Sequence, residues 1–392
     1  MSCVLLSSLS YEGNYGGVEN SLRYLAKSYK NKSKNVIILS SSSTSEKFER
    51  VSVEDDITLV RFRRTFSVNN IVNIILFPLV IIDLIISLFI IKRNYVIEKS
   101  ICRNQFVCFF VNLFFRRVNV YVAPGFSHRQ SSKTNMTLNS PTLAIRQKVH
   151  MLFDFAALRL SASVYVFSEN MKEQSEELVS IFSFRKNFTK VKITKPGVDK
   201  IVFYPVDLEE RDKIRSKLEL PSDKIVLLCV GRCVKAKGFD YALQLLVKNK
   251  STHLIIVGDG PELETIKNHA KAIDISDQVT FAGACFNTAE YYQASDYFIM
   301  SSVYEPLGQT ILEAISCGLP VIAFRNNVMT ATYEIMGDMG VIYIDKPVDI
   351  DIHKVSLCLS NCNDIKYQDL KMQALARSYL FEWDYLADEL LS

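Results

Sequence analysis

The chain has 392 residues, of which 48% are hydrophobic and 22% are charged. This length is enough for two α/β domains of ordinary size, and the composition excludes a disordered or fibrous protein. The nine cysteines are odd in number, no signal-peptide pattern opens the chain, and no histidine lies near the C-x3-C pairs at a ligand spacing. We therefore expect reduced thiols, a cytosolic setting and no zinc site.

The net charge of +4 is divided unevenly between the two halves of the chain. Residues 1–200 carry 28 Lys and Arg against 15 Asp and Glu, whereas residues 201–392 carry 18 against 27. Such asymmetry indicates an anionic partner for the first half. No nucleic-acid-binding module is recognisable, so we expect no nucleic acid. An anionic membrane surface or a phosphate-bearing lipid acceptor fits this charge, and a basic surface without a partner is the alternative.

The chain opens with the pattern of a Rossmann-like domain. Residues 3–7 predict a strand, residues 13–17 read Gly-Asn-Tyr-Gly-Gly, residues 18–30 predict a helix, and residues 35–39 predict a second strand. A glycine loop between a strand and a helix lets the backbone approach a phosphate group. The loop alone is weak evidence, because it does not match the G-x-G-x-x-G pattern.

Residues 71–91 form an apolar stretch that is long enough to cross a bilayer. Asp83 would lie near the bilayer centre, and Pro78 is placed to open a helix of ordinary length. The stretch also stands between two strand-like segments, where the crossover helix of a Rossmann-like domain belongs. Three possibilities follow: a spanning helix, a buried helix, and a helix that also touches the membrane. A second apolar helix predicted at residues 106–115 favours a monotopic membrane contact of the first domain.

The link between the two halves is predicted near residues 195–222, where prolines and a Pro-Gly pair interrupt the pattern. After it, strands alternate with helices again, which predicts a second parallel sheet. We place a first domain at residues 1–200, a second domain at residues 201–375, and a closing helical segment at residues 376–392.

The most informative segment, residues 302–320, places Glu305 and Glu313 on either side of a Pro-Leu-Gly turn. Proline and glycine fit poorly inside a helix, so a helix is predicted to begin near Gln309 or Thr310. Its first turn presents unpaired backbone N–H groups, which suit a phosphate group. The two carboxylates then accept from hydroxyl groups at either end of a phosphorylated sugar. Two solvated acids beside a helix cap are the alternative.

The spacing of Glu305 and Glu313, followed by Gly-Leu-Pro-Val at residues 318–321, resembles the E-x7-E signature of the family-4 (group 1) retaining glycosyltransferases. The likeness extends along nearly the whole chain. It implies the α/β GT-B fold, in which two Rossmann-like parallel-sheet domains face each other across a cleft. It also implies that the closing helix near Trp383 crosses back to the first domain.

The resemblance also implies a site. The Gly-Arg at residues 231–232 and the Lys-Gly at residues 237–238 resemble the family's G-R…K-G motif, in which the two cations hold the donor diphosphate. The implied catalytic residues are Glu305, Arg232, Lys237 and His128. The implied donor-binding residues are Gly16, Gly17, Gly231, Arg232, Lys237, Glu305, Leu307, Gly308, Gln309, Thr310 and Glu313, with no metal ion and no cofactor.

The chain departs from the family at two places. Pro124 stands where many members carry a histidine after a strand of the first domain, so either His128 fills that role or the role is absent. Arg325-Asn326-Asn327 replaces a glycine-rich turn that touches the donor in relatives. Hydrolysis is disfavoured, because retaining glycosidases need carboxylates about 5–5.5 Å apart, and eight positions across a turn and a helix are expected to span about 10 Å or more.

We therefore expect a metal-independent, retaining hexosyltransferase that transfers a sugar from a UDP- or GDP-sugar to a lipid-linked or polysaccharide acceptor. Family habit and the basic, apolar first domain suggest bacterial cell-surface glycan biosynthesis, such as lipopolysaccharide, capsule or exopolysaccharide. The expected location is cytoplasmic, peripheral on the inner face of the cytoplasmic membrane. A nucleotide-sugar epimerase of GT-B fold and an inactive membrane-bound scaffold are the alternatives. The sugar, the base, the linkage, the acceptor and the oligomeric state stay open.

Overall fold

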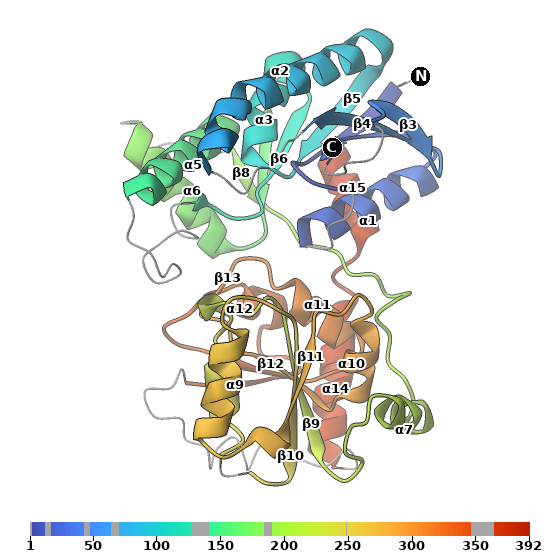
Figure 1. The fold of residues 1–392 in the computed structure, drawn as a ribbon. Helices are drawn as coiled ribbons and strands as arrows, with labels where there is room; N and C mark the ends of the chain where they lie inside the picture. Colours follow the sequence, from blue (N-terminus) through green and yellow to red (C-terminus); the bar gives the residue numbers. More distant parts are fainter. Residues whose placement is uncertain are drawn as a thin grey trace. The chain divides into compact units, whose positions relative to one another are not determined.

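The computed structural model describes residues 2–11, 17–42, 48–63, 70–127, 141–183, 190–247, 249–345 and 364–392. The chain divides into two compact units, Met1–Thr194 with Trp383–Ser392, and Lys195–Glu382. Each unit has a largely or wholly parallel sheet covered by helices on both faces (Figure 1). The prediction of an α/β protein with two Rossmann-like parallel sheets is therefore confirmed.

The first unit holds the N-terminal elements and the last helix of the chain. Its strands are β1 (Ser2–Ser7), β2 (Asn35–Ser42), β3 (Val51–Glu54), β4 (Ile57–Arg63), β5 (Val96–Cys102), β6 (Asn119–Val122), β7 (Ser163–Val166) and β8 (Val191–Ile193). Its helices are α1 (Gly17–Asn31), α2 (Asn70–Asn94), α3 (Gln105–Phe115), α5 (Pro141–Leu160), α6 (Glu169–Phe182) and α15 (Trp383–Leu391).

The eight-stranded sheet of the first unit has the order β3-β4-β2-β1-β5-β6-β7-β8, and only β3 pairs antiparallel. The chain moves outward from β1 in one direction and later returns to place β5 on the other side of β1. Helix α15 packs beside α1 (Figure 1), where Tyr24 stacks on Trp383 and the Tyr29 hydroxyl donates to the Ala387 carbonyl at 3.1 Å. The last helix therefore belongs to the core of the first unit.

Helix α2 differs from its expected start. It begins at Asn70 and carries Pro78 inside it, so the prediction that Pro78 opens the helix is wrong. One proline removes a single backbone hydrogen bond, and a long apolar helix packed on a sheet tolerates this loss. None of the helices in the described ranges is long and apolar enough to cross a membrane.

One face of α2 is buried and the other is exposed. Leu84, Leu88 and Ile91 are fully buried against the sheet, whereas the apolar residues of the opposite face are exposed: Leu79, Ile82, Ile86 and Phe89. The Asp83 carboxylate forms an ion pair with Arg50 at 2.6 Å, which accounts for an acid in an apolar helix. Of the three possibilities, a wholly buried helix is therefore wrong.

The second unit holds the remaining elements. Its strands are β9 (Ile225–Val230), β10 (Thr252–Val257), β11 (Val279–Gly283), β12 (Tyr297–Met300), β13 (Tyr304–Glu305), β14 (Val321–Phe324), β15 (Met329–Thr330) and β16 (Val341–Ile344). Its helices are α7 (Leu208–Lys217), α8 (Phe239–Gln244), α9 (Leu263–Ala272), α10 (Ala289–Ala294), α11 (Gln309–Ser316), α12 (Thr332–Met336) and α14 (Ile365–Ser378), with 3-10 turns at η1 (Lys235–Lys237) and η2 (Ser276–Gln278).

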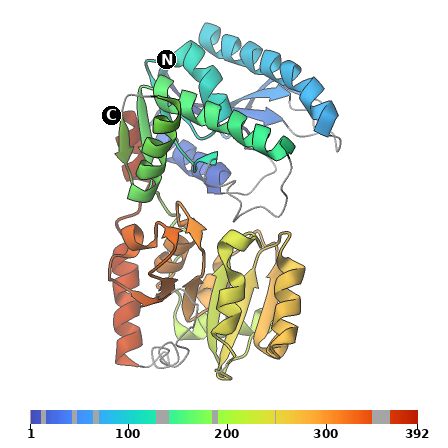
Figure 2. The same cartoon turned by 90° about the vertical axis from the view of Figure 1, so that its left-hand side faces the viewer.

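Six strands of the second unit form a parallel sheet in the order β11-β10-β9-β12-β14-β16. Successive residues of its strands alternate between two hydrophobic cores, so that Val226 and Leu228 face one core while Leu227 and Cys229 face the other. Helices α8 and α9 cover one face, and α10 and α11 cover the opposite face (Figures 1 and 2). These layers hold the strand ends of this unit in fixed positions.

Candidate active site

The order of strands in the second unit reverses at β9. From β9 the chain adds β10 and β11 on one side, and it then returns to place β12 on the other side of β9. Ligands of open parallel sheets bind at such a reversal, outside the carboxyl ends of the two strands. Gly231 and Arg232 follow β9, and residues 301–305 follow β12. The predicted donor-binding segments therefore meet at the position where a ligand is expected.

Lys237 and Glu305 are brought together at this edge of the sheet. The Lys237 ammonium forms an ion pair with Glu305 Oε2, and both side chains are mostly buried, at 19% and 13% exposure. The backbone fixes the pair from both sides, because Val303 N–H donates to Ala236 O at 2.9 Å and Ser301 Oγ donates to Lys237 O at 2.8 Å. Two predicted catalytic residues are therefore held in contact by the fold.

Helix α11 begins at Gln309, as the Pro-Leu-Gly turn predicts. Its N-cap residue, Gly308, has φ +74°, and a Cβ added there would lie 2.7 Å from the Ile335 side chain. The left-handed backbone therefore favours glycine here, and the end of the Ile335 side chain would have to shift to admit a larger residue. The Gly308 N–H points at Glu305, with a long contact of 3.4 Å to Oε1. Glu305 is thus connected to the N-terminus of α11 as well as to Lys237.

Glu313 lies one turn inside α11, as predicted, and accepts a hydrogen bond from the Tyr292 hydroxyl at 2.8 Å. Burial raises the pKa of Glu313 to about 7, while the Tyr292 hydrogen bond and the positive charge of Lys237 act in the opposite direction. Lys237 therefore lies within electrostatic reach of both glutamates. Tyr292, on α10, was not among the predicted site residues, and no local sequence pattern distinguishes it from an ordinary core tyrosine.

Glycines also shape the strand ends beside Lys237. A Cβ on Gly231 would lie 3.0 Å from Lys237 Cε, so the lysine side chain rests on the glycine. A Cβ on Gly258, which follows β10, would lie 1.9 Å from the Gly231 carbonyl oxygen. The two loops therefore pack backbone against backbone, a contact that only glycine permits. The Gly-Asp-Gly-Pro turn at residues 258–261 is the sequence signal for this contact.

The other predicted site residues do not contact Lys237, Glu305 or Glu313 through any hydrogen bond or ion pair among the described residues. Arg232 is exposed, and within the described ranges no residue forms a hydrogen bond or ion pair with its side chain. Gln309 donates to the Gly197 carbonyl at 3.2 Å, and the buried Thr310 hydroxyl has no partner in the described part of the chain. Leu307 is partly exposed beside them. Gly17 begins α1 in the first unit. Gly16 and His128 lie outside the described residues.

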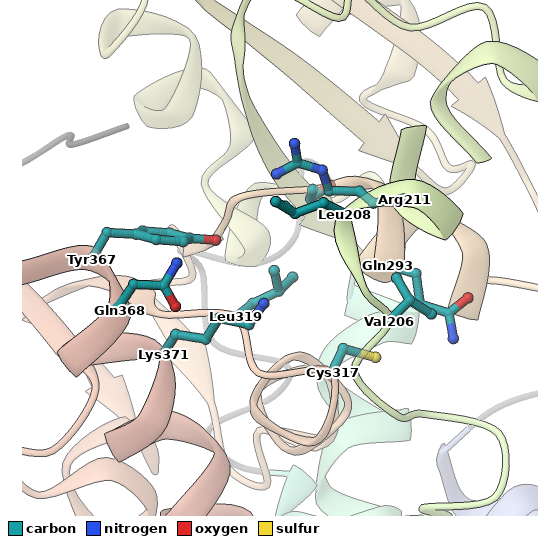
Figure 3. A pocket seen from close by; sticks show the side chains of 10 residues that line it. Val206, Leu208, Arg211, Gln293, Cys317, Leu319, Tyr367, Gln368 and Lys371 are labelled. Atoms are coloured by element: carbon teal, nitrogen blue, oxygen red, sulfur yellow. The ribbon is translucent and has the colours of Figure 1, made fainter. Parts of the chain in front are cut away.

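A small pocket of the second unit lies elsewhere. Its cavity of about 20 Å³ is lined by residues that include Arg211, Cys317 and Tyr367 (Figure 3). Arg211 pairs with Asp296, which directly precedes β12, so the pocket lies toward the amino ends of the strands. A cavity of this size holds about one water molecule, and it carries no part of the predicted site. Within the described residues, no cluster of three or more His, Cys, Asp or Glu side chains is placed to hold a metal ion.

Comparison with known proteins identifies the second unit. Residues 210–373 match the family model for glycosyl transferases group 1. The second unit is a group 1 glycosyltransferase domain. The lipopolysaccharide core biosynthesis glycosyltransferase LpsE of Rhizobium meliloti (strain 1021) is 37% identical over 112 residues, which are 29% of this chain and 33% of that protein. The chain thus spans about a third of the length of the curated relatives that it matches.

Solved structures extend the likeness in fold to both units. Sucrose-phosphate synthase from Thermosynechococcus elongatus superposes with a TM-score of 0.78 at 18% identity, covering 99% of this chain and 97% of that one. Anabaena HepE in complex with UDP-glucose superposes with a TM-score of 0.72 at 17% identity, covering 100% and 98%. The fold is therefore GT-B. The group 1 glycosyltransferase domain contains Lys237, Glu305 and Glu313, the three predicted residues that the structure brings together.

Proposed function

We propose that the chain is a retaining, metal-independent glycosyltransferase that uses a UDP- or GDP-sugar and a lipid-linked or polysaccharide acceptor. The pathway we propose is bacterial cell-surface glycan biosynthesis. The observation that carries the proposal is the contact of Lys237 with Glu305 at the strand-order reversal, beside the N-terminus of α11 and within reach of Glu313. A lysine, two carboxylates and unpaired helix N–H groups in one place match the parts of a nucleotide-sugar.

The proposed reaction explains why these charged groups are needed. When the anomeric C–O bond breaks, negative charge grows on the departing nucleoside diphosphate. Lys237 has three N–H donors, so it can hold Glu305 and a phosphate oxygen at the same time. Arg232 supplies a planar fork that matches two phosphate oxygens, and its exposed side chain is available for them. We assign Glu305 to the sugar hydroxyls and Glu313 to the ribose. This chemistry requires no cofactor.

The relatives support the donor and the acceptor class. HepE is described in complex with UDP-glucose, and LpsE is described as a lipopolysaccharide core biosynthesis enzyme. Both descriptions agree with a nucleotide-sugar donor and with a glycan acceptor at the cell envelope. They are properties of those proteins, and for this chain they define which donors and acceptors to test first.

We also propose that the protein binds the inner face of the cytoplasmic membrane through the first unit. The exposed apolar face of α2 is followed by exposed Lys92 and Arg93. Helix α5 repeats the combination, with exposed Ile145, Val149 and Leu152 next to exposed basic residues at positions 146 and 148. Apolar side chains beside cations suit the boundary between acyl chains and anionic headgroups.

The donor site is tested by titrating the purified protein with UDP and GDP, and by following turnover of the preferred nucleotide-sugar. Lys237→Ala should lower turnover by about 10²–10³-fold, because one preorganised charge is lost from the leaving group. Lys235→Ala is the matched control, since Lys235 lies in the same 3-10 turn and is exposed, whereas the ion pair with Glu305 is formed by Lys237. Equal effects of the two substitutions would contradict the proposed role of Lys237.

The same assay separates the alternatives. A transferase needs an acceptor for full turnover, whereas an epimerase interconverts the nucleotide-sugar when no acceptor is present. A scaffold that has lost its activity turns over neither. Binding of neither UDP nor GDP to the folded protein would refute the transferase proposal and favour the scaffold.

A further inference from the structure

The first unit contains its own strand-order reversal, and an arginine stands at it. The sheet reverses between β1 and β5, and Arg103 directly follows β5. The Arg103 N–H donates to the Ser7 carbonyl at the end of β1, at 2.9 Å. This backbone hydrogen bond holds Arg103 between the carboxyl ends of β1 and β5. Open parallel sheets bind their ligands at this position.

The Arg103 side chain is buried and forms no ion pair with any described residue, although the negative charge of Glu19 acts on it. Arg103 is 1% exposed, and Nε, Nη1 and Nη2 form no hydrogen bond within the described ranges. Its guanidinium lies 5.1 Å from the centroid of the Phe167 ring, a contact that leaves the N–H groups in the ring plane unsatisfied. Buried charges in proteins are normally paired and hydrogen-bonded, because an unpaired one carries a large free-energy penalty. Within the described residues, Arg103 lacks a hydrogen-bonded partner of this kind.

Two further buried polar atoms near Arg103 form no hydrogen bond of good geometry in the described part of the chain. They are the Tyr121 hydroxyl on β6 and the Asp154 Oδ1 atom on α5. Charge interactions link Tyr121 to both Arg103 and Asp154, and the Tyr121 hydroxyl lies close enough to the Asp154 carboxyl to lower its pKa. Asp154 does not neutralise Arg103, because its Oδ2 atom accepts from the Ser127 N–H at 3.0 Å and from the Ser127 hydroxyl. The three side chains therefore form one cluster with donors and an acceptor unused.

We propose that Arg103, Tyr121 and Asp154 bind the acceptor substrate through an oxyanion on the acceptor, a phosphate or carboxylate group. The fork of Arg103 takes two oxygens of the anion, and the Tyr121 hydroxyl donates to it as well. The free oxygen of Asp154 accepts from a neighbouring hydroxyl group of the same acceptor. The inference rests on the proposed function, and it narrows the acceptor to an acidic glycan or polyol.

The test uses the full chain with two small probes, inorganic phosphate and glucuronate, and it measures the rise in melting temperature as each probe is added. Arg103→Met should weaken binding of the effective probe by about 10–100-fold, the usual effect of losing a charge-assisted bidentate pair. Arg103→Lys should restore binding only partly, because an ammonium cannot contact two oxygens in the same geometry. Arg159→Met, which removes an exposed arginine from α5, is the control and should leave binding unchanged.

Folding is checked independently. Replacement of an unpaired buried charge by methionine removes its penalty, so Arg103→Met should melt at the same temperature as the unmodified protein or higher. If it does not fold, Tyr121→Phe keeps the ring, removes the hydroxyl and should weaken probe binding several-fold. An effect with phosphate alone would indicate a phosphorylated acceptor, and an effect with glucuronate alone a uronic acid. Probe binding that is absent, or unchanged in the variants, would overturn the inference.

The failure of this inference is distinguishable from the failure of the proposed function. UDP and GDP titrations report on the second unit and do not involve Arg103. Nucleotide binding without Arg103-dependent anion binding overturns the acceptor site alone. Arg103-dependent anion binding without nucleotide binding overturns the proposed function and leaves an anion site in the first unit.

Discussion

Glu313→Gln should make the second unit more stable at high pH and leave its stability unchanged at low pH. Burial raises the pKa of Glu313 from an ordinary value of 4.5 to about 7. The native state therefore binds a proton more tightly than the unfolded chain, and stability falls as the pH rises from about 4.5 to about 7. At about 1.4 kcal/mol per pKa unit, the full loss above pH 7 is about 3 kcal/mol. Glutamine carries no charge at any pH, and it still accepts from Tyr292.

The measurement is the free energy of opening of the second unit, obtained from hydrogen exchange of amides in β9 and β12 at pH 5, 6, 7 and 8. The Glu313→Gln protein should exceed the unmodified protein by less than about 1 kcal/mol at pH 5 and by about 3 kcal/mol at pH 8. Other titrating groups cancel in this comparison. Burial also raises the pKa of Asp154 to about 6, but that residue is the same in both proteins.

A control variant isolates the effect of burial. Glu264 is 76% exposed in its ion pair with Lys267, so Glu264→Gln should change stability by less than about 0.5 kcal/mol at every pH. The reasoning would be refuted if Glu313→Gln showed the same dependence on pH as the unmodified protein. In that case the Glu313 carboxylate would be solvated in the native state, contrary to its burial in the structure.

Three further substitutions test the packing, the second-unit site and the membrane surface. Gly258→Ala should destabilise the second unit by about 2 kcal/mol or more, measured by urea unfolding, because its Cβ would lie 1.9 Å from the Gly231 carbonyl oxygen at a φ of +145°. Tyr292→Phe should raise the pKa of Glu313 further, because the hydroxyl that stabilises the carboxylate is lost. It should therefore weaken the binding of UDP or GDP at pH 7, measured by titration. Unchanged nucleotide affinity would count against the assignment of Glu313. Serine at Ile82, Ile86 and Phe89 together should weaken binding to vesicles with anionic lipid by about 100-fold or more in a sedimentation assay, because each buried apolar side chain contributes about 1.5–3 kcal/mol, whereas Val53→Ser on exposed β3 should not.

Features that depend on neighbouring residues could be predicted from the sequence. The start of α11 follows from the Pro-Leu-Gly turn, and the placement of Glu313 one turn later follows from the start. The alternation of Val226, Leu227 and Leu228 between two cores likewise follows from the period of a strand buried on both faces. Local backbone preferences and periodicity are sufficient for these features, because they involve residues close together in the chain.

The contact between Lys237 and Glu305 has a different origin. The two residues are 68 positions apart, and they meet because β12 pairs with β9 instead of extending the sheet beyond β11. No property of either residue specifies that strand order. The family resemblance assigned both residues to the donor site but did not predict their ion pair, and spacing alone left open a sugar-phosphate site and two solvated acids. The role of Tyr292 was missed for the same reason, since its partner lies on another helix.

Helix α2 shows a limit of hydrophobic patterns. Its sequence is apolar on almost every side, so the pattern cannot indicate which face meets the sheet. In the structure, the face with Leu84 and Leu88 is buried and the face with Ile82 and Ile86 is exposed. The helix also begins before Pro78, since a proline inside a helix removes only one backbone hydrogen bond.

The two strand-order reversals differ in how their cations are neutralised. In the second unit, Lys237 has Glu305 as a counter-ion in the free protein, so loss of the lysine leaves a partly buried carboxylate unpaired. In the first unit, Arg103 forms no ion pair or side-chain hydrogen bond among the described residues, so its loss removes a desolvation penalty. Substitution of Lys237 should therefore lower both stability and turnover, whereas substitution of Arg103 should raise stability and lower acceptor binding. A substitution that raises the stability of the protein and lowers its affinity for a ligand indicates that the residue serves binding and not folding. These two opposite effects would identify Arg103 as part of a binding site.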